Sequence, residues 1–345
     1  MNIFLDDGFL DINAIAKIDE PFKIIIGSRQ IGKTYGLSKW LIDNNRRFIY
    51  MRRLASEIEF ITANEEDNPF MKVYRTEKED KYALSFYKNG KYIYNIYNIN
   101  DDEKSNLIGI SLALGSVAKI RGFNADRYTD IFYDEFIPEK HVSKIRNEAD
   151  ALFNAYETIN SNRELNGEKP VNLWLLGNSN NLNNPILEGL GLIRHIEKMK
   201  NRGQIISILH DRGIVIINIE NSPISNKKRE TALYKATKNT EFQKMALSNE
   251  FAYNDFSNIT SKKLIEYRPL CTIGNITILT NKNLSDIYAI NKKIQCRYNY
   301  DTSTTGIQSF KMNYGTLYYY YIDGSFYFDS FETKNFLLQI FGWYV

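Results

Sequence analysis

The chain has 345 residues, which is too long for one ordinary domain core and predicts two domains or slightly more. Hydrophobic residues make up 43% of the sequence and charged residues 25%, a composition that excludes bulk disorder, and the net charge of +3 points to no particular class of partner. The two cysteines fit no zinc-binding or CxxC spacing and favour a reduced, intracellular protein. The acidic N-terminus lacks the features of a signal peptide, and no run approaches the roughly eighteen apolar residues of a membrane span, so we expect a soluble protein with no membrane partner.

Residues 27–34 read GSRQIGKT and match the P-loop pattern G-x-x-x-x-G-K-[ST]. In this pattern the glycines let backbone N–H groups point at phosphates, the lysine neutralises the β- and γ-phosphates, and the hydroxyl ligates Mg²⁺. A buried-strand run at 22–26 precedes the loop and an amphipathic helix follows it, which is the setting that the pattern requires. The predicted nucleotide-binding residues are Gly27, Ser28, Arg29, Gln30, Ile31, Gly32, Lys33 and Thr34, with Thr34 also a metal ligand.

Further strands are expected between the P-loop and the next motif. Residues 47–51 read as a second parallel strand, and residues 81–99 predict a β-hairpin that turns at Asn89-Gly90. The stretch AKIRGF places Lys119 and Arg121 in a loop before the following strand, where either side chain could lie near a nucleotide.

The stretch YTDIFYDEFIPE contains a short buried strand at 130–133 that ends in Asp134 and Glu135. An aspartate at the end of a strand beside a P-loop can hold Mg²⁺ through water, and a glutamate after it can polarise the attacking water. The pair favours ATP hydrolysis over a GTPase switch. Asp134 is therefore predicted as a metal ligand and Glu135 as a catalytic residue, with Asp130 as the substitute if Glu135 proves dispensable.

A helix is predicted over 147–159, and the stretch NSNRE after it is expected to expose Arg163; the pattern alone assigns this arginine no role. The next strand, 171–176, ends in polar residues that include Asn178. In sheets with an additional strand between the P-loop strand and the acidic strand, this position brings a polar side chain beside the γ-phosphate. Asn178 is either such a residue or part of an asparagine-rich turn without chemistry.

The stretch from Lys198 to Lys244 contains ten lysines and arginines against four acids. This excess predicts either contacts with phosphates or a solvated helical face. The last third of the chain is rich in tyrosine and phenylalanine and reads as short β-rich runs, with hairpin signals at Gly274-Asn275 and Asp323-Gly324 and a helix at the C-terminus.

Several stretches resemble the DNA-packaging ATPases of phi29-like bacteriophages, small relatives of the large terminases. The resemblance covers roughly residues 20–255. It is carried by the P-loop with an arginine at its third position and by the stretches FIYMRR (48–53), FYDEFIPEK (132–140), NEADALFNAYETINSNRE (147–164) and KKRETALYKATKNTEFQKMALSNEF (227–251).

The resemblance implies a ring, a pentamer in this family, that uses ATP and Mg²⁺ to drive double-stranded DNA into a procapsid. It implies that Arg29 contacts phosphate, that Asn178 couples hydrolysis to movement, and that Lys119 or Arg121 takes the place of a lysine in the loop before the acidic strand. The family's trans-acting arginine corresponds to Ser161 in this chain, so the role shifts to Arg163, with Arg146 as the second choice. Partners implied by the resemblance are a capsid portal or connector and, as an open point, a structural RNA, at the procapsid vertex in the host cytoplasm.

We therefore predict an α/β P-loop NTPase domain of the additional-strand, RecA- or terminase-like type over 1–222. A basic linker or lid at 223–255 follows, in which Lys227, Lys228 and Arg229 are expected to meet DNA or a neighbouring subunit. A small β-rich domain at 256–345 completes the chain; the resemblance implies a vestigial ribonuclease-H-like docking module, and with so few acids in this region nuclease activity is not expected.

Two alternative functions remain open. The first is a phage or plasmid P-loop ATPase that acts in protein export or on RNA. The second is a DNA-binding scaffold that binds nucleotide without hydrolysing it.

Overall fold

A computed structural model describes residues 1–63, 68–77, 83–89, 93–99, 105–120, 124–138, 145–178, 182–219, 222–240, 243 and 257–343. It divides into two compact units, one formed by Met1–Leu190 with Lys198–Tyr253 and the other by Gly191–Glu197 with Asn254–Val345. No helix in these described ranges is both long enough and apolar enough to cross a bilayer.

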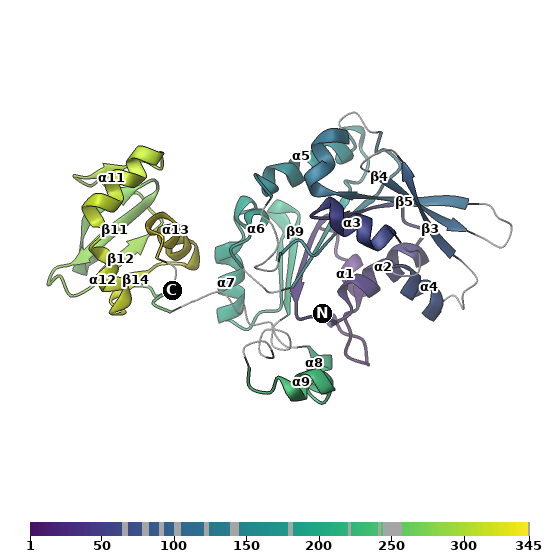
Figure 1. The fold of residues 1–345 in the computed structure, drawn as a ribbon, viewed down its shortest axis with the longest axis horizontal. Coiled ribbons are helices and arrows are strands. Elements are labelled where there is room, and N and C mark those ends of the chain that lie inside the picture. Colours follow the sequence, from purple (N-terminus) through teal and green to yellow (C-terminus); the bar gives the residue numbers. More distant parts are fainter. Residues whose placement is uncertain are drawn as a thin grey trace. The chain divides into compact units, whose positions relative to one another are not determined.

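The first unit is built on a nine-stranded sheet with the order β3-β4-β5-β2-β6-β7-β1-β9-β8 (Figure 1). The six central strands β5, β2, β6, β7, β1 and β9 are parallel to one another. The pairs β3–β4, β4–β5 and β9–β8 are antiparallel. The bounds are β1 Phe22–Gly27, β2 Phe48–Arg52, β3 Ala83–Asn89, β4 Ile93–Ile99, β5 Ser105–Ala113, β6 Asp130–Asp134, β7 Asn172–Gly177, β8 Ile206–Leu209 and β9 Ile214–Ile219.

Helices join and cover these strands (Figure 1). The α-helices are α1 Ile12–Ala16, α2 Lys33–Asp43, α3 Ala55–Thr62, α4 Met71–Glu77, α5 Glu148–Asn160, α6 Pro185–Gly189, α8 Pro223–Lys228 and α9 Ala232–Ala236. Helix α7, Ile193–Asn201, begins in the second unit and ends in the first. Short 3-10 helices are η2 Leu114–Ile120, η3 Glu164–Asn166 and η4 His210–Arg212.

The central strands are buried on both faces, which explains their unbroken apolar runs. In β1, Ile24, Ile25 and Ile26 are each fully buried. Ile25 packs on one face in a cluster with Leu37 and Leu41 of α2, and its two neighbours point to the opposite face. The loop between β1 and α2 is therefore held at both ends by elements that pack in the core.

The predicted fold class is confirmed, with each of the four predicted parallel strands within one residue of its expected bounds. The additional strand is present, because β7 lies between β1 and β6. The predicted hairpin is formed by β3 and β4, although Gly90 of its turn lies outside the described residues.

The second unit contains a five-stranded sheet with the order β13-β10-β11-β12-β14. Its strands are β10 Tyr267–Ile273, β11 Ile276–Asn281, β12 Ile287–Ile290, β13 Asn299–Tyr300 and β14 Phe326–Phe328, and its helices are η5 Leu264–Glu266, α11 Thr304–Tyr314, α12 Leu317–Ile322 and α13 Phe331–Phe341. Phe310, Leu317 and Leu337 of the helices pack in one buried cluster with the sheet.

The C-terminal sheet domain and its last helix agree with expectation, and so does the turn at Gly274, where φ is +57°. The tyrosine-rich run was expected to form a strand, but it forms α12 instead, and Asp323-Gly324 connects this helix to β14 rather than closing a hairpin. Aromatic residues favour strands only where they fit a pleated, half-buried surface. Here Leu317 and Tyr321 pack as helical residues on the sheet, so tertiary packing overrides the local preference.

Candidate active site

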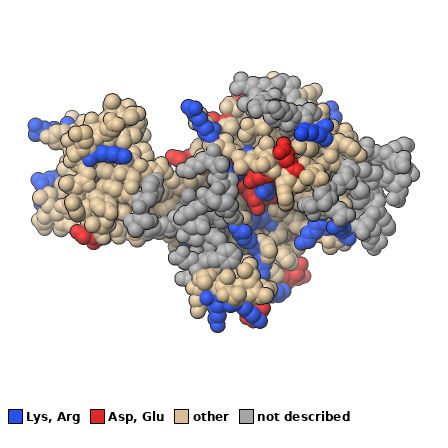
Figure 2. Space-filling view, viewed as in Figure 1, with Lys and Arg blue, Asp and Glu red and all other residues tan. Residues whose placement is uncertain are grey.

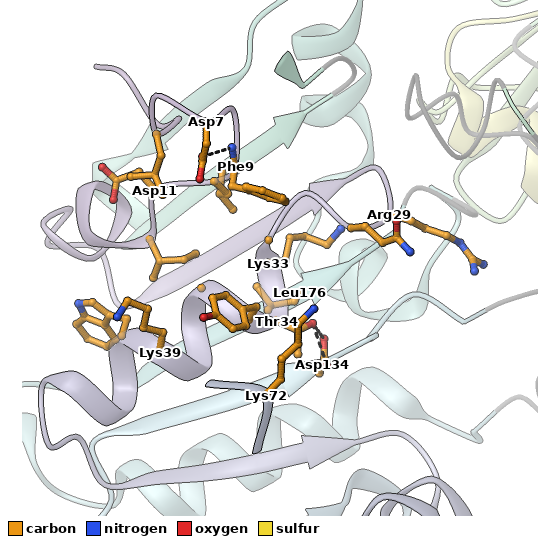
Figure 3. Close-up of a pocket in the computed structure, with 18 of the residues that line it drawn as sticks. Asp7, Phe9, Asp11, Arg29, Lys33, Thr34, Lys39, Lys72, Asp134 and Leu176 are labelled. Atoms are coloured by element: carbon orange, nitrogen blue, oxygen red, sulfur yellow. Dashed lines mark hydrogen bonds between the residues drawn. The ribbon is translucent and has the colours of Figure 1, made fainter. Parts of the chain in front are cut away.

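A cavity of about 1010 Å³ lies at the carboxyl ends of β1, β6 and β7. The loop between β1 and α2 lines it together with Asp134 (Figure 3). Glu135 and Asn178 line it as well. Three adjacent parallel strands deliver their following residues to one edge of the sheet, which is where ligands bind in open α/β folds. The structure therefore brings together residues that lie about a hundred positions or more apart in the chain.

The backbone of the P-loop adopts conformations that explain its glycines. Gly32 has φ +94°, and a Cβ at this position would lie 3.3 Å from the ring of Phe9. A Cβ on Gly27 would lie 2.6 Å from the side chain of Ile31. Gln30 also has a positive φ, +58°. Such a turn aims successive N–H groups into the loop, the arrangement that binds phosphate.

Lys33 is the first residue of α2 and is buried with its amine at the centre of the site. Its Nζ donates to the carbonyl oxygens of Gly27 and Ser28 at 2.9 and 2.8 Å and to Oδ1 of Asn178 at 3.0 Å. Burial lowers the pKa of Lys33 to about 7, and the nearby carboxylate of Asp134 opposes this shift. A cation held this way lacks a full counter-charge and is ready to receive an anion.

Thr34 and Asp134 form the second part of the site. Oγ1 of Thr34 donates to Oδ1 of Asp134 at 3.1 Å, and Figure 3 shows this contact beside Lys33. Burial raises the pKa of Asp134, while the guanidinium of Arg52 opposes the shift. A hydroxyl and a carboxylate that converge next to a phosphate loop are the oxygen donors that Mg²⁺ prefers, so these two residues fit that ion.

Glu135 follows Asp134 in a left-handed backbone conformation with φ +55°, and its side chain is 53% exposed. Nη2 of Arg52 donates to Oε2 of Glu135 at 2.6 Å, and Nη1 lies 3.4 Å from Oδ2 of Asp134. Arg52 was not singled out from the sequence. The stretch FIYMRR shows that Arg52 lies at the end of a strand. Its contact with Glu135 depends on β2 lying next to β6 in the sheet, and the sequence does not show which strands are neighbours.

Arg53 points the other way and binds α5. Its guanidinium donates to both carboxylate oxygens of Glu148, at 2.7 and 3.0 Å, and the hydroxyl of Tyr133 donates to the same carboxylate at 3.1 Å. Both charged side chains are only 2% exposed. This buried pair fixes the start of α5, two residues after the exposed Arg146.

Arg163 is not exposed, contrary to the expectation from sequence. Its side chain is largely buried, and Nη2 donates to the backbone carbonyls of Asp126 and Tyr128 at 2.5 and 2.7 Å. These contacts tie the turn after α5 to the loop that enters β6. The expectation that Arg163 is exposed is therefore wrong, and the contacts of its guanidinium within the chain argue against a trans-acting role.

The basic residues of the predicted DNA-binding group have different surroundings. Lys227 and Arg229 are exposed on the lobe of α8 and α9, where Figure 2 shows lysine and arginine side chains at the surface. Lys228 instead lines the cavity, and its Nζ donates to the carbonyl of Arg29 at 2.5 Å. Lys228 thus has a partner within its own chain, and the expectation that these three residues meet DNA or a neighbouring subunit stays a prediction.

Three other expected positions complete the comparison. Lys119 belongs to η2, and Arg121 lies outside the described residues. Asp130 stands at the opposite end of β6 from Asp134 and accepts hydrogen bonds from Arg46 and from the indole of Trp174, at 2.7 and 3.0 Å. Its place in this structural network removes it as a substitute for Glu135.

The segment before β1 also lines the cavity, a contribution that the sequence did not reveal. Phe9 packs on Gly32, and the backbone N–H of Leu10 donates to the carbonyl of Ile31 at 3.0 Å.

In the second unit, Lys262 and Tyr267 both donate to Asp286, at 2.7 and 3.0 Å. In the part of the chain that the structure describes, no three histidines, cysteines or acids lie close enough to hold a metal ion.

The chain is similar to one protein family and to several known proteins. Residues 7–278 match the model of the family described as Podovirus DNA encapsidation protein (Gp16). The DNA packaging protein of Bacillus phage B103 is 28% identical over 254 residues, which cover 71% of this chain and 68% of that protein. The DNA packaging protein of Bacillus phage phi29 is 27% identical over 252 residues, which cover 70% of this chain and 66% of that one.

The fold is also similar to that of a chain in the bacteriophage Phi-29 viral genome packaging motor assembly, with a TM-score of 0.68 over 99% of both chains at 20% identity. At this identity the likeness establishes a shared fold across both units. The alignments with the two Bacillus phage proteins extend over about two thirds of the length of each. Together the matches confirm the resemblance to phi29-like packaging proteins that the motifs indicated.

Proposed function

Because the chain belongs to the family of podovirus DNA encapsidation proteins, we propose that it is an ATP-driven motor that moves double-stranded DNA into a viral procapsid. The observation that carries the proposal is the contact of Thr34 with Asp134 beside the buried amine of Lys33. The hydroxyl of Thr34, the carboxylate of Asp134 and the amine of Lys33 converge at one point, which supports a Mg²⁺–nucleotide site.

ATP and Mg²⁺ are the proposed cofactors. Lys33 and the N–H groups of the P-loop would bind the phosphates, Arg29 would add a phosphate contact, and Thr34 and Asp134 would hold Mg²⁺. When bound, the ion neutralises charge that develops on the transferred phosphoryl group. Asn178 accepts from Lys33, so it is placed to respond when that amine turns towards a phosphate.

Glu135 is the proposed general base. Its carboxylate would orient a water molecule and accept its proton during attack on the γ-phosphate. In the structure that carboxylate pairs with Arg52 at 2.6 Å. The guanidinium of Arg52 occupies the carboxylate of Glu135 in this pair. Hydrolysis therefore requires Glu135 to leave Arg52 before it can bind the attacking water. Arg52 is proposed to keep the site inactive until Glu135 is released from it.

A ring of identical subunits is proposed, with one arginine of each subunit completing the site of its neighbour. Arg146 is now the first choice, because it is exposed and lies next to the anchored start of α5, whereas Arg163 is buried. The number of subunits, five by resemblance, belongs to the same proposal. So do a capsid portal and a structural RNA as partners, and the procapsid vertex in the host cytoplasm as the place of action.

Double-stranded DNA is the proposed substrate of the motor, and Lys227 and Arg229 are the proposed contacts. Each phosphate contact that is lost should reduce the slope of log affinity against log salt concentration by roughly 0.9. A Lys227→Ala/Arg229→Ala double variant with an unchanged slope would remove both residues from the DNA-binding surface.

Phosphate release with and without double-stranded DNA tests the function. The unchanged chain should hydrolyse ATP faster when double-stranded DNA is added, and Glu135→Gln should bind ATP but lose about 10²- to 10⁴-fold in turnover, because removal of a general base has effects of that size. Glu168→Gln, which removes a charge from an exposed residue outside the cavity, is the matched control and should behave as the unchanged chain.

Other outcomes select the alternative functions. Turnover stimulated by RNA or by an exported protein, but not by double-stranded DNA, would favour an ATPase of another pathway. Nucleotide binding without any phosphate release, under each of these conditions, would favour a scaffold that is gated by nucleotide.

A further inference from the structure

Lys228 differs from the other basic residues of α8 in where its amine lies. Of the group Lys227, Lys228 and Arg229, only Lys228 lines the cavity. Its side chain crosses from α8 to the P-loop, some two hundred residues away in sequence, and donates to the carbonyl of Arg29 at 2.5 Å. A lysine chosen only for a DNA-binding face would not need this position.

The two lysines of the cavity bind neighbouring carbonyls of one loop. Lys33 donates to the carbonyls of Gly27 and Ser28, and Lys228 donates to that of the next residue, Arg29. The two amines therefore approach the first half of the P-loop from two different elements, α2 and α8. Lys33 also lies beside Asp134 and Thr34, which mark the end of the site where the terminal phosphate and its metal ion belong.

The charges of this arrangement are unbalanced. Burial lowers the pKa of Lys228 to about 8. The carboxylate of Asp134 lies near Lys33, whereas the Arg29 oxygen that Lys228 binds is a neutral carbonyl, which offsets the charge of this second amine only in part. An anion between the two amines would satisfy both.

The position of α8 does not depend on Lys228 alone. The turn at Gly8, where φ is +93°, packs so closely on α8 that a Cβ would lie 3.0 Å from the backbone nitrogen of Ile224. Lys227 donates to the carbonyl of Asp7 at 3.2 Å, and Ile224 packs against the core of the first unit. These contacts hold α8 beside the P-loop, so that Lys228 is positioned for a ligand in the cavity.

We propose that Lys228 is a ligand of the γ-phosphate and that its amine exchanges the Arg29 carbonyl for a phosphate oxygen when ATP binds. The inference rests on the proposed nucleotide site and adds to it a residue that senses the terminal phosphate. The exchange is favourable because a hydrogen bond between two charged groups is stronger than one to a neutral carbonyl.

Equilibrium binding of a non-hydrolysable ATP analogue and of ADP to Lys228→Gln tests the proposal. The analogue should bind about ten- to a hundredfold more weakly, which is the worth of one charge-assisted hydrogen bond, and ADP should lose less than about threefold. Lys228→Arg should recover much of the affinity for the analogue. Lys235→Gln is the matched control, because Lys235 carries the same charge on the same lobe but is 62% exposed and pairs with Glu230; it should leave both affinities unchanged.

The outcomes separate this proposal from the proposed function. If the unchanged chain binds neither nucleotide, the nucleotide site itself is absent. If the unchanged chain binds both and Lys228→Gln binds both equally well, only the role of Lys228 is wrong. If Lys228→Gln weakens both nucleotides to the same extent and lowers the melting temperature, Lys228 supports the fold of α8, and the γ-phosphate assignment is overturned.

Discussion

The two units of the chain differ in what they do with polar side chains at the ends of their strands. In the first unit β1, β6 and β7 are parallel neighbours, so Lys33, Asp134 and Asn178 follow the same edge and meet in one cavity. In the second unit β10, β11 and β12 are antiparallel, so successive strand ends alternate between two edges. A parallel sheet concentrates functional groups, whereas an antiparallel meander distributes them.

The acids of the two units show the same difference. Asp134 is shared by Thr34 and Arg52 within a cavity. Asp286 is bound by Lys262 and Tyr267, and Asp329 accepts from Thr333 at 2.5 Å. In the second unit these carboxylates serve local structure, and in the first the corresponding group remains directed at a ligand site. Substitutions in the two units should therefore affect different properties.

The largest effect is expected from Arg146→Ala, which tests whether the residues at the edge of the first sheet form a complete catalytic site within one chain. Arg146→Ala should leave ATP affinity nearly unchanged and lower DNA-stimulated turnover by about 10³- to 10⁵-fold, because a trans-acting arginine stabilises charge only in the transition state. Phosphate release measures this. A mixture of Arg146→Ala with Glu135→Gln should regain some turnover, since one subunit supplies the glutamate and the other the arginine. Normal hydrolysis by Arg146→Ala would show that the first unit needs no arginine at this position.

A smaller effect on ATP affinity is expected when one lysine of each unit is replaced by alanine. Lys33→Ala should weaken ATP binding by about a hundredfold or more, because it removes the buried cation that binds the phosphates. Lys262→Ala also removes a lysine paired with an acid, but it should leave ATP affinity unchanged and cost about 1.5 to 3 kcal/mol of unfolding free energy. Fluorescence titration and denaturant unfolding report the two quantities. Equal ATP affinity in both variants would contradict the division of roles between the units.

Arg163 should act on stability rather than on catalysis. Arg163→Ala leaves the carbonyls of Asp126 and Tyr128 without this donor and should destabilise the chain by about 1.5 to 3 kcal/mol, the range for hydrogen bonds to charged groups. The measurement is urea unfolding. Arg163→Lys should retain part of the stability, and an unchanged unfolding midpoint in Arg163→Ala would mean that these contacts contribute nothing.

The smallest effect is a pH dependence of binding. The pKa of Lys33 is lowered to about 7, and a bound phosphate favours the protonated amine. Binding therefore takes up a proton above that pH, and ATP affinity should fall several-fold as the pH rises from about 7 to about 9. Calorimetry in two buffers of different ionisation enthalpy would detect the uptake. Affinity that rises over this interval would contradict a protonated Lys33 in the complex.

Contiguous motifs were readable from the sequence because their geometry is local. The glycine positions of the P-loop, the strand before it and the Asp134–Glu135 pair each depend on neighbours within a few residues. The parallel sheet followed from the same apolar runs. The tyrosine-rich run that forms α12 was misread, because its conformation depends on packing against the second sheet and not on its own preference.

By itself the sequence determined the nucleotide loop, the acidic strand end and the membership of a packaging family. Only the tertiary structure decided the surroundings of the long basic side chains. Arg52 reaches Glu135 because β2 adjoins β6, Arg163 is buried because the turn after α5 closes on the loop before β6, and Lys228 enters the cavity because α8 packs on the N-terminal turn. The physical reason is that an arginine or lysine side chain is long, flexible and strongly charged, so its partner is set by which elements lie within its reach in the fold.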